Sequence, residues 1–542
     1  MLGVKLLRSQ GWLKIGAKQK RASNMSFDLP EEFNAADYFI DRNIREGRSE
    51  KAAVLCEGRV TTYGDMQVMV NRFGNALKSL GVRMENRVAM LLQDTEVFPQ
   101  VFFGTIKMGA VPVCLNTMQK SKDFEYYLND SRAEVLIVDA LLLELIEPIR
   151  GNLRFVKHIV VSNGISPYGD LSLDTQISGQ PDKLEAAPTH KDDVCFWLYS
   201  SGTTGLPKGV VHLQHDMVYL CETYGKKVLG ICESDITFSA PKLFFAYGLG
   251  AGLYFPFSVG ATAVYLPHRP TPEAVYETIY RHSPTLFFAV PTLYGQLLEH
   301  EGHMESVRLG ISGGEALPST YLHRVKKRFD IDVLDGVGST EMAHVYISTS
   351  PGDIRAGSTG KIVPGFEARI VDENLQDVPV GETGVLLIKG DSAAAYYWNK
   401  HEQTKKTMLG PWLNTGDKYS QDADGYFYFS GRADDMFKVG GNWVSPIEVE
   451  ACLLEHRAVL ECAVVGALDS DSMTKPMAFV VLDSDSEKSP EMVNELQNYV
   501  KSALALYKYP RWIRFMNELP KTVTGKIKRF ELRQMAQNLA ER

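Results

Sequence analysis

The sequence predicts an α/β protein with a large N-terminal domain of parallel α/β sheets, a β-rich subdomain and a small, mobile α+β C-terminal domain. Three observations lead to this prediction. Short apolar runs alternate with helical patterns through the first two thirds of the chain, the pattern changes twice after that, and the chain has 542 residues. A single hydrophobic core stops growing at about 250–300 residues, so two or more domains are expected.

The parallel sheets are predicted from the order of apolar runs. Residues 87–94, 110–116 and 133–140 have the composition of buried strands, and residues 95–109 show helical apolar spacing between the first two. The same order returns over 285–337. Such βαβ order predicts parallel sheets covered by helices. Ligands of open α/β sheets bind at the carboxyl ends of the strands, so chemistry is expected there.

The pattern changes from about residue 355. Short strand patterns with turn residues over 358–390 predict a β-rich subdomain or small barrel, and the charged, glycine-rich segment GRADDMFKVGG predicts a linker. Residues 446–542 then alternate helix and strand within the usual size of a domain. The expected division is an N-terminal domain over 25–431, a short linker at 432–435 and a C-terminal domain over 436–542.

The first 24 residues differ from the rest because they contain six basic residues and no acidic one. A presequence or a helix at a membrane surface has this composition. However, the sequence MSFDLPEEF, which begins at Met25, has the character of an ordinary N-terminus. A misplaced start or a disordered leader over 1–24 is therefore the interpretation that we favour.

Composition excludes several classes of function. The net charge of −8 argues against a nucleic-acid partner. None of the seven cysteines has the CxxC spacing of zinc sites, and sparse cysteines are typical of a reducing compartment, so we expect a cytoplasmic protein. The basic leader leaves an organelle as the alternative. The most apolar stretch, 248–266, is interrupted by glycine and proline and predicts a buried helix and strand rather than integral membrane contact.

A loop with the sequence SSGTTGLPKG, residues 200–209, is the strongest local signal. Backbone N–H groups in a glycine-rich turn bind anions, hydroxyl groups add donors, and Lys208 adds positive charge. The loop is not a Walker A motif, because Gly209 follows the lysine where that motif has Ser or Thr. It therefore indicates a polyphosphate site, with a flexible polar surface loop as the alternative.

Two further stretches end predicted strands. In DGVGSTEM, residues 335–342, Thr340 can donate to a phosphate and Glu341 can bind Mg²⁺, although Ser or Thr followed by Glu is also a common helix cap. In ISGGEALP, residues 311–318, paired glycines allow a flat ring to approach the backbone, or they form a tight turn.

Three charged residues near the C-terminus could complete such a site. Asp417 can accept hydrogen bonds from both hydroxyls of a ribose with help from Arg432, and an ion pair at the surface is the alternative. Lys526 follows Gly525 in PKTVTGK, where a solvated basic stretch is the alternative.

The order of these stretches is more informative than any one of them. YSSGTTGLPKG, GVGSTEM, TGD, GRADDMFKVGG and PKTVTGK together resemble the adenylate-forming superfamily of acyl-CoA synthetases, luciferases and peptide-synthetase adenylation domains. The resemblance covers about residues 35–535. The segments KLFFAYGLG, GSTEMAHVYIS and LALYKYPRW are most similar to the benzoate-CoA ligase group.

This resemblance implies a role for each motif residue. The phosphate contacts would come from Ser201, Thr203, Thr204 and Lys208, the α-phosphate contact from Thr340, and the Mg²⁺ contact from Glu341. The adenine would be framed by Gly314, Glu315, Ala316, Asp335 and Gly336, and the ribose held by Asp417 and Arg432. Lys526 would bridge the carboxylate and the α-phosphate. The N-terminal domain over 25–431 would be the adenylation domain, and the C-terminal domain over 436–542 would be a lid that rotates at Asp434 in a hinge at 432–435. After this rotation the opposite face of the lid, around Lys438 and Gly441, would serve thioester formation.

The resemblance also places an acyl pocket, lined by Phe245, Ala246, Tyr247, Gly338, His344 and Val345. Flat apolar walls with one or two polar groups suit an aromatic ring. Acetate-activating relatives have a tryptophan where Gly338 stands, so this pocket is open. Amino-acid activators hold the ammonium group with an aspartate in the segment that corresponds to 243–248, and that segment has no acidic residue here. His344 could instead be a core histidine. Ala343 and Val345 are smaller than the Leu and Ile of the group, which extends the expected acids to hydroxy-, amino- or fluorobenzoates and to alicyclic carboxylates.

The sequence thus predicts an aryl-carboxylate CoA ligase, an acid-thiol ligase that uses ATP, Mg²⁺ and coenzyme A. A medium-chain or alicyclic acyl-CoA synthetase is the first alternative, and a luciferase-like oxygenase shares the fold. A non-catalytic nucleotide-binding protein is the alternative of a different class, and the retained Lys208, Glu341 and Lys526 argue against it. A homodimer and acylation of Lys526, which would remove its charge, are further expectations.

Overall fold

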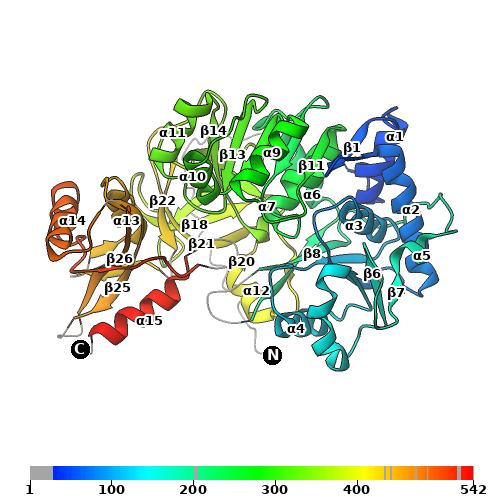
Figure 1. The fold of residues 1–542 in the computed structure, drawn as a ribbon. Coiled ribbons are helices and arrows are strands. Elements are labelled where there is room, and N and C mark those ends of the chain that lie inside the picture. The colour runs from blue at the N-terminus through cyan, green and yellow to red at the C-terminus, as the bar shows by residue number, and fades with distance from the viewer. Residues whose placement is uncertain are drawn as a thin grey trace, which may run out of the picture.

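The computed structural model describes residues 29–200, 206–432, 435–439, 442–469, 473–484, 486–521 and 527–540. The leader predicted over 1–24 lies outside these residues. Two large mixed sheets with their helices form one end of the molecule, a smaller antiparallel sheet lies beside them, and a C-terminal unit forms the other end (Figure 1). The predicted α/β class with a small C-terminal unit is confirmed.

One large sheet has eight strands in the order β19-β9-β8-β4-β3-β5-β6-β7. The strands are β3 (Arg87–Leu91), β4 (Val111–Cys114), β5 (Val135–Asp139), β6 (His158–Ser162), β7 (Leu171–Ser172), β8 (Val194–Ser200), β9 (Lys208–Leu213) and β19 (Tyr396–Tyr397). The strands from β8 to β7 are parallel, as predicted, whereas β9 and β19 add antiparallel pairs at one edge. The β8–β9 pair is antiparallel because only the short phosphate loop joins its strands, and a parallel crossover needs a dozen residues or more.

The other large sheet has nine strands in the order β16-β15-β14-β13-β12-β10-β11-β1-β2. They are β1 (Ala52–Cys56), β2 (Arg59–Thr62), β10 (Ile236–Ser239), β11 (Thr262–Tyr265), β12 (Leu286–Ala289), β13 (Leu309–Gly313), β14 (Val333–Gly338), β15 (Val345–Ser348) and β16 (Lys361–Ile362). Its centre, from β1 to β14, is parallel, and antiparallel strands again close both edges.

The core lies between the two large sheets. A single hydrophobic cluster contains Met90 of the first sheet, Phe288 of the second, and Phe98, Phe102 and Phe103 of helix α3 (Val97–Lys107). Every residue of α3 is buried, which explains the weak polar face of its sequence. The apolar stretch 248–266 is also buried, as the helical segments α7 (Ala246–Leu249), η5 (Gly250–Tyr254) and α8 (Phe255–Val259) followed by strand β11.

The remaining helices of this part cover the sheets or connect their strands. They are α1 (Arg42–Arg45), α2 (Tyr63–Ser79), α4 (Ser121–Ser131), α5 (Leu173–Ile177), α6 (Asp216–Leu220), α9 (Pro272–His282), α10 (Pro291–Glu299) and α11 (Ser319–Phe329). Helix α2 begins at a capping box in which Thr62 and Asp65 exchange hydrogen bonds. Helices α9 and α10 both begin with a proline in the first turn, where no backbone donor is required.

The β-rich part is an open antiparallel sheet rather than a closed barrel. It contains β17 (Glu367–Val371), β18 (Gly384–Lys389), β20 (Met408–Leu409), β21 (Trp412–Gln421) and β22 (Phe427–Arg432). Strand β21 pairs with β18, β20 and β22, and β17 pairs with β18. Nearby β16 and β19 instead join the two large sheets, so the barrel that the sequence suggested does not form.

The C-terminal unit has a core of its own. Its elements are β23 (Phe437–Val439), β24 (Asn442–Val444), α13 (Pro446–Leu454), β25 (Val459–Leu468), β26 (Thr474–Leu482), α14 (Pro490–Ala503), β27 (Trp512–Phe515) and α15 (Arg529–Ala540). Alternate residues of β25 and β26 enter two hydrophobic clusters on opposite faces of the sheet, with Val464 in one and Val465 in the other. This unit therefore buries apolar side chains on both faces of its sheet.

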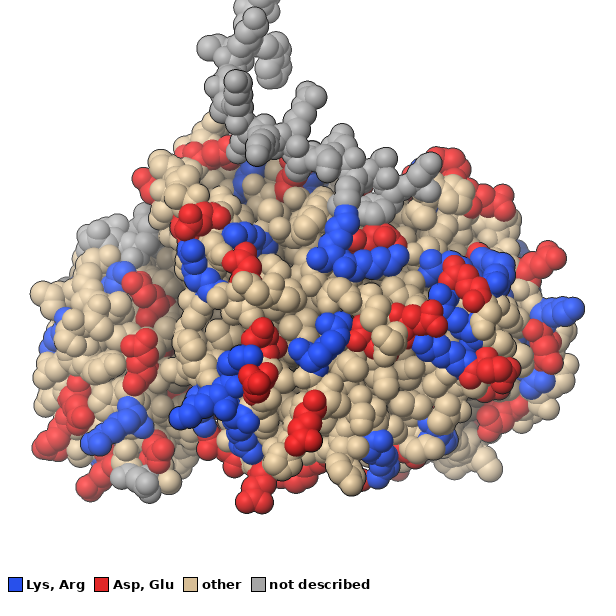
Figure 2. All heavy atoms as spheres, turned by 90° about the horizontal axis from the view of Figure 1, so that it is seen from above, with Lys and Arg blue, Asp and Glu red and all other residues tan. Residues whose placement is uncertain are grey.

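Surface features accompany these cores. On the face shown in Figure 2, acidic and basic side chains are interspersed rather than gathered in separate areas. Among the described residues, no helix is long and apolar enough to cross a membrane. All seven cysteines are free thiols, and six of them are buried.

Candidate active site

Two of the predicted motifs come together where strands β13 and β14 end. Gly314 directly follows β13 and adopts a left-handed backbone with φ of 88°, which a residue with a side chain would adopt only with strain. Strand β14 carries Asp335, Gly336 and Gly338, and the 3₁₀ turn η6 (Thr340–Met342) follows it at once. Because β13 and β14 are parallel neighbours, their carboxyl ends meet at one edge of the sheet.

Several predicted site residues lie outside the described part of the chain. They are Ser201, Thr203 and Thr204 of the phosphate loop, Asp434 and Gly441 near the hinge, and Lys526. For Lys438 the structure describes only the backbone, which pairs with that of Trp443 in the β23–β24 hairpin.

At the predicted phosphate end of the site, Glu341 is bonded to strand β8, which leads into the phosphate loop, and to strand β19. Glu341 Oε1 accepts a hydrogen bond from Ser200 Oγ at 3.2 Å and another from the Tyr397 hydroxyl at 2.8 Å. The Lys208 ammonium lies 4.3 Å from the centre of the Tyr397 ring, a cation–π contact. Burial and the neighbouring Glu341 charge raise the pKa of Tyr397, so its phenol stays protonated and remains a donor.

The Thr340–Met342 turn is held by its main chain as well. Its three successive carbonyl oxygens accept hydrogen bonds from His212 Nε2 at 2.8 Å, from the Ala394 N–H at 2.8 Å and from Ser392 Oγ at 3.0 Å. Ser339 caps the turn by accepting from the Met342 N–H at 3.2 Å. The common cap that the sequence offered as an alternative is thus present in the same segment as Glu341.

Sequence reasoning missed the side chains that support this turn. Tyr397 and Ser392 lie more than 50 residues after Glu341, in a segment without a recognisable motif. His212 lies four residues after Lys208, so that it shares one face of strand β9 with that lysine. This spacing is the one signal that could have drawn attention to His212.

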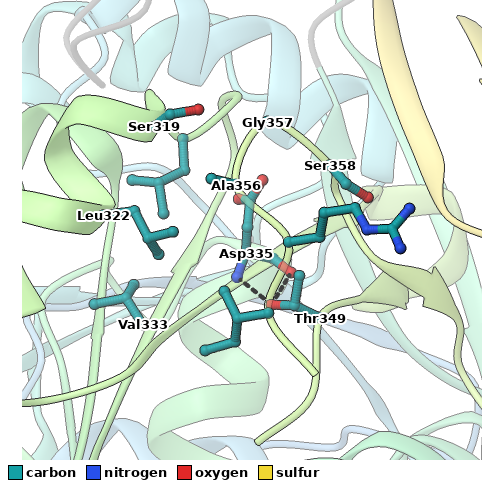
Figure 3. Close-up of a pocket in the computed structure, with 11 residues that line it drawn as sticks. Ser319, Leu322, Val333, Asp335, Thr349, Ala356, Gly357 and Ser358 are labelled. Atoms are coloured by element: carbon teal, nitrogen blue, oxygen red, sulfur yellow. Dashed lines mark hydrogen bonds between the residues drawn. The ribbon is translucent and has the colours of Figure 1, made fainter. Parts of the chain in front are cut away.

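Asp335 lies beside a narrow pocket at the predicted adenine side. Its N–H donates to Thr349 Oγ1 at 2.9 Å, and its carbonyl oxygen accepts from the Thr349 N–H at 2.9 Å (Figure 3). Burial raises the pKa of the Asp335 carboxyl to about 7, against the effect of nearby backbone N–H groups. Its Oδ1 atom is buried without a partner among the described residues. The cavity is about 10 Å³, which is room for about one water molecule.

The other predicted adenine residues lie close by. Glu315 Oε2 accepts a hydrogen bond from Thr292 Oγ1 at 3.2 Å. A Cβ atom added to Gly336 would lie 3.1 Å from the Val345 side chain, so the sheet is tightly packed at this point. Ala316 follows Glu315 in the loop between β13 and α11.

The two predicted ribose residues form an ion pair. Arg432 Nη1 donates to Asp417 Oδ1 at 2.7 Å, and the two residues are directly opposite each other in the β21–β22 pair. The Asp417 residue is only 7% exposed, whereas Arg432 is exposed. The structure therefore brings these two residues together at an edge where one of them is accessible.

The predicted acyl pocket surrounds His344. His344 Nε2 lies 3.1 Å from the Tyr247 carbonyl oxygen, which only accepts, so Nε2 donates. Burial lowers the pKa of His344 to about 3, and the ring is therefore neutral. Its Nδ1 atom is buried and has no partner among the described residues. The rings of Phe255, Tyr247 and Tyr224 lie 4.7, 5.3 and 5.5 Å from the His344 ring, between centres.

Two segments carry the other residues of the predicted pocket. Phe245 and Tyr247 are partly exposed and Ala246 is buried, at the start of α7. Val345 is buried in β15, opposite Gly338. A Cβ atom on Gly338 would lie 2.4 Å from the His344 carbonyl oxygen, so a larger residue would displace the backbone of His344. The glycine that the sequence associated with an open pocket is also required by the local backbone.

Glu341 is the predicted protein ligand for Mg²⁺, and its surroundings fit a metal that is bound mainly by the substrate. Among the described residues, no group of three or more His, Cys, Asp or Glu side chains could hold a metal ion. Mg²⁺ is commonly bound by one or two carboxylates together with substrate phosphates and water. Both hydrogen bonds described for Glu341 go to Oε1. A single carboxylate beside Lys208 therefore fits a metal that arrives with a polyphosphate.

Comparison with known proteins identifies the family of the chain. The AMP-binding enzyme family matches residues 40–398, and the AMP-binding enzyme C-terminal domain matches residues 448–526. A benzoate-CoA ligase of Thauera aromatica is 47% identical over 512 residues, which are 93% of this chain and 96% of that protein. A 4-hydroxybenzoate-CoA/benzoate-CoA ligase of Rhodopseudomonas palustris is 43% identical over 93% of this chain and 94% of its own.

Among solved structures, an anthranilate CoA ligase (AuaEII) in complex with anthranoyl-AMP matches with a TM-score of 0.90 and 44% identity, covering 95% of this chain and 99% of that chain. Family, sequence and fold comparisons thus point the same way, and they confirm the resemblance on which the motif assignments rest. The chain belongs to the AMP-binding enzyme family, the adenylate-forming family that its motifs predict, and is similar to the benzoate-CoA ligases within it.

Proposed function

We propose that the protein is an aryl-carboxylate CoA ligase of the benzoate type, which forms an acyl-adenylate from ATP and then an acyl-CoA. The observation that supports this most directly is that one short segment, 338–344, carries residues of both predicted subsites. It supplies Gly338 and His344 to the acyl pocket and Thr340 and Glu341 to the phosphate end. A carboxylate bound in that pocket would lie beside the α-phosphate that it attacks.

In the first step a carboxylate oxygen attacks the α-phosphorus and pyrophosphate leaves. Negative charge gathers on the phosphoryl oxygens, so catalysis here depends on positioning and electrostatic stabilisation. Lys208 and the hydroxyls of Ser201, Thr203 and Thr204 would bind the leaving phosphates, Thr340 would donate to the α-phosphate, and Lys526 would bridge both reactants. Mg²⁺ bound at Glu341 would neutralise charge on the phosphates.

In the second step the sulfur of CoA attacks the acyl carbon, and the bond to AMP breaks. We propose that the C-terminal lid over 436–542 rotates at Asp434 between the steps, so that the face around Lys438 and Gly441 replaces Lys526. The separate core of this unit supports the idea, because a unit with its own core can move as a body. Asp335 with Gly314, Glu315, Ala316 and Gly336 would frame the adenine, and Asp417 with Arg432 would hold the ribose.

The surroundings of His344 bear on which ring is bound. Its neutral ring presents an unpartnered acceptor, Nδ1, inside a group of aromatic side chains. An unpaired buried acceptor is costly, and a ring substituent that donates a hydrogen bond would remove that cost. This favours benzoates with an amino or hydroxyl group. The similarity to an anthranilate CoA ligase and to a 4-hydroxybenzoate-CoA/benzoate-CoA ligase supports the same substituents.

Formation of the thioester tests this proposal. Purified protein is incubated with MgATP, CoA and benzoate, and benzoyl-CoA, AMP and pyrophosphate are quantified together. One equivalent of each product, dependent on all three substrates, is the expected result. Adenylate without thioester would point to an adenylating enzyme with another acceptor, and nucleotide binding without turnover would favour the non-catalytic alternative.

The seven free cysteines fit a reducing compartment, so we propose the cytoplasm. We also propose acylation at Lys526 as a switch that removes its positive charge, with mass spectrometry of the native protein as the test. Only unmodified Lys526 in that measurement would count against the switch.

A further inference from the structure

Two residues outside the predicted motifs, His212 and Asp216, form a fully buried pair behind the Thr340–Glu341 turn. His212 Nδ1 lies 2.7 Å from Asp216 Oδ2, and both side chains are 0% exposed. On its other side, His212 Nε2 lies 2.8 Å from the Thr340 carbonyl oxygen. The pair therefore connects strand β9 and helix α6 to the turn that carries Thr340 and Glu341.

The hydrogen bonds define the form of the His212 ring. The Thr340 carbonyl oxygen only accepts, so Nε2 donates to it. Asp216 Oδ2 also accepts from the Leu213 N–H at 3.2 Å. The short contact between Nδ1 and Oδ2 holds a proton between the ring and this carboxyl group. Both ring nitrogens are therefore hydrogen-bonded, as buried polar atoms generally are.

The ring is also held from the side. The Phe196 ring of β8 stacks on it, with 4.9 Å between ring centres and 17° between planes. His215 Nε2 lies 3.3 Å from the other oxygen of Asp216. His212 is thus restrained by contacts from β8, α6 and the turn, so that its ring can hold strand β9 at a fixed distance from the turn.

The two strands around the phosphate loop are attached to the turn at two points. Ser200 and Lys208 are opposite each other in the β8–β9 pair, and Ser200 Oγ donates to the Glu341 side chain at 3.2 Å. His212, four residues beyond Lys208 on the same strand, donates to the Thr340 main chain. The hairpin that carries the phosphate-loop lysine therefore contacts two residues of the turn, Thr340 and Glu341.

We infer that His212, paired with Asp216, is a positioning residue for the adenylation step. By joining β9 to the Thr340 carbonyl, it keeps Lys208 and the Thr340–Glu341 turn in register on the two sides of the bound phosphates. This inference rests on the proposed function, because it concerns how ATP is held for attack. It applies to adenylation more than to thioester formation, since the leaving phosphates are present only in the first step.

Separate assays of the two half-reactions test the inference. Adenylation is followed as benzoate-dependent pyrophosphate release, and thioester formation as benzoyl-CoA made from supplied benzoyl-AMP and CoA. The variants are His212→Leu, His212→Gln and Asp216→Asn, and melting temperatures are measured for each. Asn43→Leu is the matched control, because Asn43 is also 0% exposed and donates to main-chain carbonyls at 2.8 and 2.9 Å, away from the site.

His212→Leu is expected to slow adenylation by about 10- to 100-fold, the range typical of residues that orient a site from outside, and to affect thioester formation much less. His212→Gln keeps an N–H donor for Thr340 and should recover part of the loss at a similar melting temperature. The adenylation rate of Asp216→Asn should lie between those of wild type and His212→Leu. Should His212→Leu not fold, the last two variants give the same comparison.

The inference would be overturned if His212→Leu slowed both half-reactions equally, by an amount that follows its fall in melting temperature and matches Asn43→Leu. That result would show that His212 only stabilises the fold. No recovery in His212→Gln at equal melting temperature would also overturn the inference. Failure of the proposed function is distinguishable, because wild-type protein would then catalyse neither half-reaction. That result would overturn the inference as well, since no adenylation would exist for His212 to serve.

Discussion

The hydroxyl of Tyr397 donates a 2.8 Å hydrogen bond to Glu341, and the face of the same ring lies 4.3 Å from the Lys208 ammonium. One side chain therefore contacts both charged groups at the phosphate end. Strand β19, which carries Tyr397, pairs with β9, which begins at Lys208. Tyr397 therefore links the carboxylate that is proposed to bind Mg²⁺ to the cation that is proposed to bind the leaving phosphates.

Tyr397→Phe removes the hydroxyl and keeps the ring against Lys208. Hydrogen bonds to charged groups contribute about 1.5–3 kcal/mol, so adenylation should slow by about 10- to 100-fold, and the Mg²⁺ concentration for half-maximal rate should rise. Pyrophosphate release against Mg²⁺ concentration measures both effects. The control is Tyr396→Phe, on the opposite face of the same strand. A loss in the control as large as in Tyr397→Phe would contradict the assignment.

Asp335 should make stability depend on pH. Its folded pKa of about 7 lies above the ordinary value of about 3.9, so between those values the folded protein retains a proton that the unfolded chain has lost. The stabilisation from this group is complete below about pH 4 and is lost as pH rises to about 7. Asp335→Asn removes the dependence, so its melting temperature relative to wild type should increase from pH 5 to pH 8. A difference that stays constant with pH would rule out this origin.

His344→Leu should change which ring is preferred. Wild type should turn over an amino- or hydroxybenzoate at a higher kcat/KM than the fluorobenzoate with the same substitution pattern, which cannot donate. Replacing His344 removes the Nδ1 acceptor, and this ratio should fall by about tenfold, because a net hydrogen bond contributes about 1 kcal/mol or somewhat more. A ratio that is unchanged in His344→Leu would show that the substituent is recognised elsewhere.

Lys526→Ala should separate the two half-reactions. If Lys526 bridges the carboxylate and the α-phosphate, its loss should abolish acyl-AMP formation and largely spare thioester formation from supplied acyl-AMP. Lys528→Ala, two residues along, is a suitable control, because Lys528 pairs with Glu531 in the C-terminal unit. Equal loss of both half-reactions in Lys526→Ala would refute the role.

Much of the fold follows from local patterns. The runs at 87–94, 110–116 and 133–140 become β3, β4 and β5, because strands buried on both faces are continuously apolar. The β-rich part was less predictable. Whether β16 and β19 close a barrel or join the large sheets depends on partners far away in the chain, and two-residue strands carry no periodicity.

The site divides in the same way. Lys208, Thr340 and Glu341 stand in motifs whose residue types suit phosphate and metal, so the sequence identifies them. Tyr397, Ser392 and His212 were not identified, because their contribution is a hydrogen bond to residues 50 or more positions distant. The pKa shifts of Asp335 and His344 also required the structure, since burial is the largest cause of both.

The most direct measurement of the central claim is kcat/KM for acyl-CoA formation with MgATP across benzoate, the hydroxy- and aminobenzoates, cyclohexanecarboxylate, hexanoate and acetate. The proposed function predicts that a benzoate or substituted benzoate exceeds hexanoate and acetate by at least about tenfold, because flat aromatic walls stack on a ring and fit a flexible chain poorly. A clear preference for hexanoate or acetate would contradict the aromatic pocket proposed around Gly338 and His344, while leaving in place the ATP chemistry proposed for Lys208 and Glu341.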